Sequence, residues 1–478
     1  MIKKTFHGGY HFNCEGKPQE KVIESDLPLK AIIPLKQGFG REVKSLVAEG
    51  DKVKAGQIIG RDDHGISSPV HASVNGTVES LVKLESSAGL INAVVINADA
   101  NPDWQPLAGH NRNWQSLTQE EIETLLYSSG VTSLDSKGIP TRFKTSSIVN
   151  SGVNDLIIRG TEDSPYNPSL SALLAGERCN HFVEGVQILQ KIMPQANVHL
   201  AINSNRRELN RELLQKTEAL KWLTFYSLSP RYPQGNDRVL TGTILGSRNE
   251  NFADAERVVV LSAGTVLQVH DAVVEGKPLI ETIIALCGPG WKENFHIRAR
   301  IGTPIDTITG SYLDQTNADW MIIPNNPMTS GAIADLSLPV DRIINSLTAV
   351  SGNIKNRSSW SLLSAVSSLK GRSCCPNVYG EVKSCIFCGY CEEVCPVGLI
   401  PHLLDKHARR NLISKDLINY GILNCVECNL CSYVCPSKIP VARHIKLGQQ
   451  KLIDYGYIEP EAGLEEDTVE NYYSGQEG

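Results

Sequence analysis

The amino-acid sequence predicts a multidomain protein of α/β and α+β parts, with a cysteine-rich domain toward its C-terminus. Its 478 residues are too many for one hydrophobic core. Residues 117–255 alternate helix and strand signals, which is typical of a parallel α/β domain. The chain has 13 cysteines, most of them in two regular runs between residues 385 and 436. We therefore expect several domains, of which the last is built around its cysteines.

The overall composition excludes some classes of protein. Hydrophobic residues make up 41% and charged residues 21% of the chain, as in ordinary globular proteins. A net charge of −6 argues against nucleic acid as a partner. The start of the chain is basic, but no apolar segment follows it, so we expect no signal peptide. No run approaches the roughly twenty apolar residues that cross a bilayer. We expect no transmembrane segment and a cytoplasmic location.

Residues 1–30 are rich in Lys, Glu and Pro and predict an irregular N-terminal arm. Residues 31–100 then predict short strands with turn residues between them, among them Gly50-Asp51 and Asn75-Gly76. The pattern GDxVxxGQ followed by SPVxAxVxGxV resembles a biotinyl- or lipoyl-type barrel-sandwich domain. The hairpin lacks the lysine that would carry such a cofactor. We therefore expect a scaffold or docking domain there.

The middle of the chain predicts two further domains. In residues 101–255, Thr118 and Glu121 form the capping-box pattern of a helix start, and residues 155–160 and 197–202 predict buried strands. Residues 256–345 mix strand and helix signals. The remaining segments are a Ser-rich linker, a cysteine domain and a C-terminal tail, at residues 346–375, 376–450 and 451–478.

The two cysteine runs carry the clearest chemistry. Each run reads CxxCxxCxxxCP, which is the bacterial ferredoxin spacing. In that pattern three close cysteines hold one [4Fe–4S] cluster and the fourth ligates the other cluster. We expect one cluster on Cys385, Cys388, Cys391 and Cys435, and a second on Cys395, Cys425, Cys428 and Cys431.

Two structural zinc sites are the alternative interpretation of these runs. The fourth cysteine followed by proline has no role in zinc binding and favours the clusters. The other five cysteines have no regular spacing and predict no disulfide framework; they are Cys14, Cys179, Cys287, Cys374 and Cys375.

Over nearly its whole length the chain resembles the RnfC family, the C subunits of Rnf ion-translocating electron-transport complexes. The resemblance rests on the two cysteine runs and on residues 232–235, 275–281, 300–304, 395–399 and 431–440. It implies a barrel-sandwich hybrid domain, a Rossmann-like domain of the complex I flavin-subunit type, an SLBB-type β-grasp domain and a ferredoxin-like dicluster domain. It also implies a peripheral subunit of an ion-translocating oxidoreductase on the cytoplasmic face of the bacterial inner membrane. Membrane subunits would be its partners, and ferredoxin or NADH its redox donor.

The same resemblance implies an FMN and NADH site, with a GxGGxGFPT loop and a GAECEPY stretch. The corresponding residues 133–141 keep only Gly138, Pro140 and Thr141, and residues 160–166 keep Glu162 and Tyr166 among others. Asp135 places a carboxylate where a phosphate would lie, and like charges about 4 Å apart cost roughly 1–4 kcal/mol at dielectric constants of 80 to 20. We expect FMN to bind weakly and NADH oxidation by this chain to be slow or absent.

Three functions remain open at this point. The first is an iron–sulfur electron-transfer subunit of an Rnf-type complex. The second is a soluble RnfC-like relay to another reductase. The third is a subunit like that of the sodium-pumping quinone reductase, which resembles the first three domains but lacks iron–sulfur clusters. The eight cysteines of the two runs count against the third.

Overall fold

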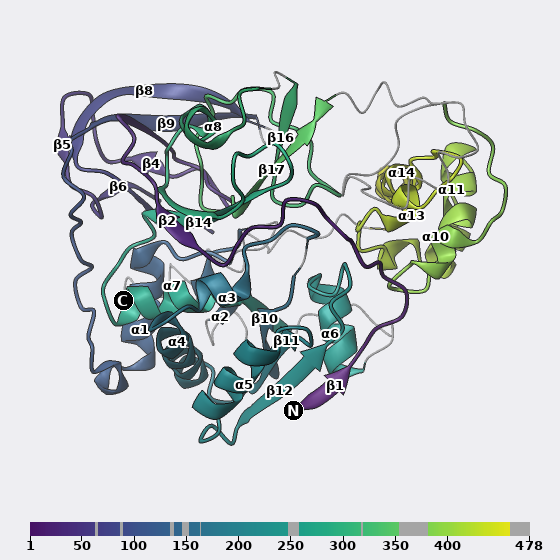
Figure 1. The fold of residues 1–478 in the computed structure, drawn as a ribbon, viewed down its shortest axis with the longest axis horizontal. Coiled ribbons are helices and arrows are strands. Elements are labelled where there is room, and N and C mark those ends of the chain that lie inside the picture. Colours follow the sequence, from purple (N-terminus) through teal and green to yellow (C-terminus); the bar gives the residue numbers. More distant parts are fainter. Residues whose placement is uncertain are drawn as a thin grey trace.

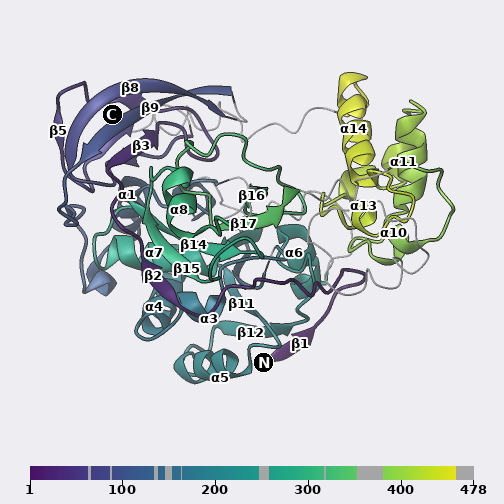
Figure 2. The same cartoon turned by 45° about the horizontal axis from the view of Figure 1, so that its top comes forward.

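The computed structural model describes residues 1–62, 66–86, 89–133, 138–145, 153–162, 164–246, 258–316, 319–352 and 381–458. Four sheets and a helical cysteine domain make up this part of the chain (Figures 1 and 2). No helix in these ranges is both long enough and apolar enough to cross a membrane.

The central element is a five-stranded parallel sheet with the order β1-β12-β11-β10-β13. Successive side chains of β10 point to opposite faces, so Leu156 and Ile158 enter one core and Ile157 the other. Helices α1, α4, α5 and α7 cover the first face, and α6 covers the second. The bounds are β1 Ile2–Lys4, β10 Asp155–Gly160, β11 Asn197–Asn203, β12 Leu223–Leu228, β13 Val258–Ser262, α1 Gln119–Ser129, α2 Thr141–Thr145, α3 Leu170–Leu173, α4 Arg178–Ile192, α5 Arg207–Lys216, α6 Asp237–Leu245 and α7 Ala263–Val273, with a 3-10 turn at Trp114–Ser116.

Local sequence signals explain several ends of these elements. Thr118 accepts a hydrogen bond from the Glu121 backbone N–H, and Glu121 bonds back to Thr118, which confirms the predicted capping box. The predicted strands at 155–160 and 197–202 are confirmed as β10 and β11.

The N-terminal barrel-sandwich domain consists of two small sheets around one core. Their orders are β3-β9-β8-β5 and β4-β6-β7. The bounds are β3 Lys30–Pro34, β4 Lys44–Ser45, β5 Lys52–Val53, β6 Ile58–Arg61, β7 Val70–His71, β8 Gly76–Ser86 and β9 Gly89–Ala98. Asn75-Gly76 is not a two-residue hairpin turn as predicted, because β7 and β8 belong to different sheets. Glycine is needed at position 76 because the backbone of β9 comes very close: a Cβ there would lie 2.0 Å from the Asn97 carbonyl oxygen.

A second five-stranded sheet, β16-β17-β14-β15-β2, forms the β-grasp domain with α8. The bounds are β2 Val22–Glu24, β14 Glu281–Cys287, β15 His296–Arg300, β16 Trp320–Pro324, β17 Ser346–Ser351 and α8 Ile305–Tyr312.

Three predicted segment assignments are corrected by these sheets. The arm is not wholly irregular, because β1 and β2 complete the edges of two sheets. Residues 346–351 are not linker but β17, which pairs with β14 and β16. Strand β13 and helix α7 belong to the parallel domain rather than to the following one, because β13 pairs with β10. In each case the partner strand supplies the backbone hydrogen bonds that a short segment cannot provide for itself.

The cysteine domain lies at one side of the molecule (Figure 1) and is helical. Its helices are α10 Tyr390–Glu393, α11 Pro401–Arg409, α12 Lys415–Asn419, α13 Leu430–Tyr433 and α14 Val441–Asp454, with a 3-10 turn at Ile422–Asn424. Leu404, Leu417 and Ile445 are among the residues that fill its core. Helix α14 continues past residue 450, so this domain extends into the segment predicted as tail.

A buried arginine joins three of the domains. Arg342, 1% exposed, donates through its guanidinium to Ser68 Oγ at 2.9 Å and to the Pro69 carbonyl of the barrel-sandwich domain. Gly130, at the end of α1, packs against the same guanidinium. Burial lowers the pKa of Arg342 to about 10, so the group is still a cation at neutral pH.

Arg342→Ala is expected to destabilise this junction. Hydrogen bonds to charged groups contribute about 1.5–3 kcal/mol each, so we expect the thermal midpoint to fall by roughly 5 °C. Lys30→Ala is the matched control, because Lys30 is an exposed cation of the barrel-sandwich domain that Arg342 contacts, and exposed ion pairs contribute about 1 kcal/mol or less. Equal midpoints for the two variants in differential scanning calorimetry would show that the junction contributes little.

Candidate functional site

The cysteines of the first cluster set surround one small cavity. Cys385, Cys388 and Cys391 of the first run and Cys435 of the second line a space of about 20 Å³. Three cysteines thus come from one run and the fourth from the other, as the ferredoxin pattern requires. Thiolate sulfur is the ligand type that suits iron–sulfur clusters, so the side chains present fit a [4Fe–4S] group.

The second set is also brought together across the two runs. Burial raises the pKa of Cys428 to about 12, and the charges of Cys425 and Cys395 contribute to the same rise. Burial likewise raises the pKa of Cys431, with further contributions from Cys428, Cys425 and Cys395. Cys395 therefore lies among the thiols of the second run. Iron binding at these cysteines must displace their protons.

The two runs share a backbone conformation at equivalent positions 40 residues apart. Positive φ angles occur at Phe387 (54°) and Glu427 (52°), and again at Gly389 (78°) and Asn429 (63°). Short helices then begin, with the third cysteine of each run in α10 or α13. The same local fold is used twice, so each run presents its first three sulfur atoms in the same way.

The two sets differ in their exposure. Cys388 is exposed, and the neighbouring Ile386 and Phe387 side chains are 66% and 67% exposed. Cys395 and Cys431, in contrast, are buried. The second set faces the rest of the protein: the Tyr232 hydroxyl donates to the Cys428 carbonyl at 2.8 Å.

The remaining five cysteines give no further cluster ligands among the described residues. Cys179 and Cys287 are buried and free, and Cys14 is disulfide-bonded. Cys374 and Cys375 lie outside the described residues. One disulfide is not a framework, but it is a covalent link that the sequence did not predict.

A cavity of about 130 Å³ lies at the carboxyl edge of the parallel sheet. Strand β10 has β11 on one side and β13 on the other, so the chain leaves β10 in one direction across the sheet and later returns to its other side. The cavity lies at this point. Ligands of open α/β sheets bind at such switch points. Gly160 and Glu162 after β10, Asn203 at the end of β11 and Gly264 in the first turn of α7 line it.

Every cation that lines this cavity is paired with a carboxylate. The pairs are Arg159 with Asp237 (3.0 Å), Arg178 with Asp271 (2.9 Å), Arg206 with Glu162 (3.1 Å) and Glu20 (2.9 Å), and Lys277 and Arg298 with Glu281 (2.7 and 2.9 Å). Although burial opposes the shift, Lys277 and Arg298 hold the pKa of Glu281 below its usual value. A phosphate entering here would compete with these carboxylates for the same cations.

A second cavity of about 290 Å³ adjoins the first, between the N-terminal arm and the parallel domain. Glu162 and Arg206 line both cavities, whereas Tyr166, Phe12 and Tyr232 line only the second. The Tyr166 hydroxyl donates to the Glu15 carbonyl of the N-terminal arm. The predicted residues Glu162 and Tyr166 are therefore brought together.

The predicted loop residues lie elsewhere. Gly138 packs against Gly38 of the barrel-sandwich domain, and its carbonyl accepts from the Phe39 N–H at 3.2 Å. Pro140 pairs with Thr132, and the buried Thr141 donates from its N–H to the Val131 carbonyl at 3.0 Å. Gly138, Pro140 and Thr141 line neither cavity. Leu134, Asp135, Ser136 and Lys137 lie outside the described residues.

Sequence reasoning missed the paired cations of the first cavity. Arg178, Arg206 and Arg298 stand in no motif, and the fold alone collects them. The sequence offered one signal for such an ion pair: Lys277 and Glu281 are four residues apart, within the stretch 275–281 that resembles the family.

Three family models match parts of the chain. They are described as the RnfC barrel sandwich hybrid domain (residues 4–101), the Nuo51 FMN-binding domain (residues 126–271) and the 4Fe-4S dicluster domain (residues 384–439). The match to the Nuo51 FMN-binding domain includes β13 and most of α7, in agreement with the pairing of β13 with β10.

Curated proteins similar to the chain include the C subunit of the proton-translocating ferredoxin:NAD(+) oxidoreductase complex of Clostridium ljungdahlii. That protein is 28% identical over 93% of this chain and 93% of its own length. The C subunit of the ion-translocating oxidoreductase complex of Serratia proteamaculans is 28% identical over 84% of this chain, which spans 54% of that protein. Among solved structures, the NAD+-reducing [NiFe]-hydrogenase in the H2-reduced state aligns with a TM-score of 0.46 and 11% identity, over 76% of this chain and 64% of that one.

We expect the purified chain to hold FMN well below one per chain, because the cations of the cavity are already paired with carboxylates. NADH should bleach the cluster absorbance slowly, whereas dithionite or reduced ferredoxin should bleach it fully. A triple variant with glycine at 133, 135 and 136 should bind FMN about tenfold more tightly in fluorescence titrations, since tenfold corresponds to about 1.4 kcal/mol.

The matched control for this experiment is the iron content, which should be the same for the triple variant and the unmodified chain. One tightly bound FMN per unmodified chain, with rapid bleaching by NADH, would contradict the prediction.

Proposed function

We propose that the chain is a member of the RnfC family of ion-translocating oxidoreductase subunits, and that it carries electrons through two interleaved [4Fe–4S] clusters to or from its partner subunits. The observation that carries the proposal is the cavity lined by Cys385, Cys388, Cys391 and Cys435, which come from both runs. The second cluster would lie on Cys395, Cys425, Cys428 and Cys431.

We propose a direction in space for the electron path. The second cluster faces the protein interior, where the Tyr232 hydroxyl contacts the Cys428 carbonyl and the Tyr232 ring lines the second cavity. That cavity shares Glu162 with the first cavity at the edge of the parallel sheet. The first cluster lies at the exposed end, beside Ile386 and Phe387. Electrons would pass between the two cavities and the surface by way of the second cluster and then the first.

The proposed redox partners are based on a relative of the chain and on the exposed surface beside the first cluster. The Clostridium ljungdahlii relative is named as part of a ferredoxin:NAD(+) oxidoreductase complex. By analogy we propose that ferredoxin or NADH exchanges electrons with this chain, directly or through other Rnf subunits. The exposed apolar surface around the first cluster fits contact with a protein partner rather than with a small molecule. The protein would be peripheral, on the cytoplasmic face of the bacterial inner membrane.

Single cysteine variants test the interleaved ligation. Cys435→Ser should damage the cluster of the first run, because the Cys435 sulfur lines the cavity of that run. Iron should fall from about eight toward four atoms per chain, since two [4Fe–4S] clusters hold about eight. Electron paramagnetic resonance of the reduced protein should give the same residual spectrum for Cys435→Ser as for Cys385→Ser.

Cys425→Ser is the matched reference for the other cluster and should leave a different spectrum. If Cys435→Ser instead gives the spectrum of Cys425→Ser, each run holds its own cluster and the proposed ligand sets are wrong.

Membrane attachment is expected to depend on protein contacts, because no described helix is suited to cross a bilayer. The chain should sediment with membranes when the other Rnf subunits are produced with it, and should remain in the supernatant when it is produced alone. Tight binding of the isolated chain to protein-free liposomes in flotation experiments would contradict this expectation.

A further inference from the structure

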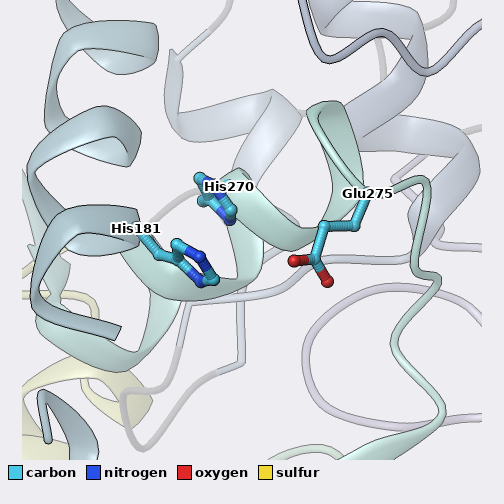
Figure 3. A group of neighbouring side chains, drawn as sticks. All are labelled: His181, His270 and Glu275. Carbon is cyan, nitrogen blue, oxygen red and sulfur yellow. The ribbon is translucent and has the colours of Figure 1, made fainter. Parts of the chain in front are cut away.

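A group of metal-ligand side chains lies outside the cluster cysteines and the two cavities. It consists of His181 on α4, His270 on α7 and Glu275 in the turn after α7 (Figure 3). One possible donor atom from each side chain lies within 4.8 Å of those of the other two. Two imidazoles and a carboxylate are a ligand set of zinc sites, which hold a fourth position for water.

His270 is positioned for metal binding by its neighbours. The ring is 2% exposed and lies between two carboxylates: Nε2 is 3.1 Å from Glu184 Oε2 and Nδ1 is 3.3 Å from Asp271 Oδ1. A neutral imidazole can donate only one of these bonds. Trp114 Nε1 donates to the other oxygen of Glu184 at 2.7 Å and so holds that carboxylate in place. When Nε2 donates to Glu184, the Nδ1 lone pair is left for a metal ion.

His181 has a ring nitrogen without a hydrogen-bond partner in the described part of the chain. Its Nδ1 is buried and unpaired, and its ring stacks on His270 with centroids 4.2 Å apart and planes at 10°. Burial, together with the charge of His270, lowers the pKa of His181. The unpaired nitrogen of His181 is therefore free to ligate a metal ion through its lone pair.

Glu275 projects from a turn that is held by hydrogen bonds on both sides. The Lys277 N–H donates to the Asp271 carbonyl at 2.8 Å, and the Leu107 N–H donates to the Gly276 carbonyl at 2.7 Å. Gly276 has a φ of +68° and packs against the His110 ring, so no larger residue fits there. The Glu275 carboxylate is directed toward the two histidines in Figure 3. The turn therefore presents this carboxylate in a fixed place.

Charge also favours a cation at this position. Three carboxylates, of Glu184, Asp271 and Glu275, lie around the histidine pair, and Arg178 neutralises only one of them through two contacts with Asp271 at 2.9 and 3.0 Å. A divalent ion would balance the excess negative charge that these side chains leave.

We propose that His181, His270 and Glu275 bind a divalent transition-metal ion of the zinc class. Donor atoms in a tetrahedral zinc site lie about 3.4 Å apart, so the group closes by about 1.4 Å or less on binding. Parallel rings cannot direct both lone pairs at one ion, so the half-buried His181 ring turns while the buried His270 ring stays.

The proposed ion would connect α4 to α7 and to the turn that follows. Arg178 at the start of α4, Asp271 in α7 and Lys277 after the turn all line the first cavity. Metal binding would therefore stabilise one wall of that cavity without being part of it.

Zinc binding by the cluster-loaded full chain tests the proposal. Anaerobic equilibrium dialysis against Zn²⁺, with zinc and iron counted together, should give one zinc per chain at unchanged iron. Zinc X-ray absorption should show nitrogen and oxygen neighbours at about 2.0–2.1 Å and no sulfur at about 2.3 Å. Glu275→Gln and His181→Ala should each weaken binding at least tenfold, and zinc should raise the thermal midpoint of the unmodified chain but not of these two variants.

Glu177→Gln is the matched control, because Glu177 is an exposed carboxylate beside the start of α4. It should bind zinc as the unmodified chain does. Sulfur-bound zinc, or equal zinc affinity in Glu275→Gln and Glu177→Gln, would overturn the proposal. Because Glu275 is exposed, its replacement leaves the packed core intact and tests the site even if His181→Ala folds poorly.

Discussion

The crossing of each fourth cysteine to the other run is the constraint on which the cysteine domain depends. Cys435 lines the cavity of the first run, and Cys395 lies among the thiols of the second. On the proposed ligand sets, neither cluster is complete until both runs have folded together, so the helices that follow the two runs must bring them into register. Helices α11 and α14 do this by packing on one another around Leu404 and Ile445. Cys395 and Cys431 are themselves buried members of the domain core, so the cluster ligands and the core pack as one unit.

The N-terminal arm then places this domain against the rest of the protein. The Gly9 N–H donates to the Val394 carbonyl at 2.9 Å. Phe12 packs edge-on against both Tyr433 of the cysteine domain (5.0 Å) and Tyr232 of the parallel domain (5.7 Å). Gly8 approaches the Cys395 carbonyl so closely that a Cβ would lie 2.6 Å from it. A segment at the very start of the chain therefore packs between the cysteine domain and the parallel domain and contacts both.

The sequence predicted local features better than pairings between distant segments. The capping box at Thr118, the strands β10 and β11 and the ferredoxin-type grouping of cysteines each depend on spacing within a few residues or on a known motif. The edge strands β1 and β2 could not be predicted, because their hydrogen-bond partners lie more than 200 residues away. The same holds for the candidate site: Glu162 and Tyr166 follow β10 closely in the sequence, and both line the second cavity. The cations around them come from separate helices and strands, so only the fold collects them.

The 40-residue repeat of the cysteine domain bears on the energetics of the two clusters. The two runs share one backbone conformation, and each proposed cluster has four cysteine ligands, so the clusters themselves are chemically alike. Their surroundings differ, because Cys388 is exposed while Cys395 and Cys431 are buried. Reduction adds a negative charge, which a buried environment disfavours. By burial alone, a cluster on the inner cysteines would have a lower reduction potential than one at the exposed end.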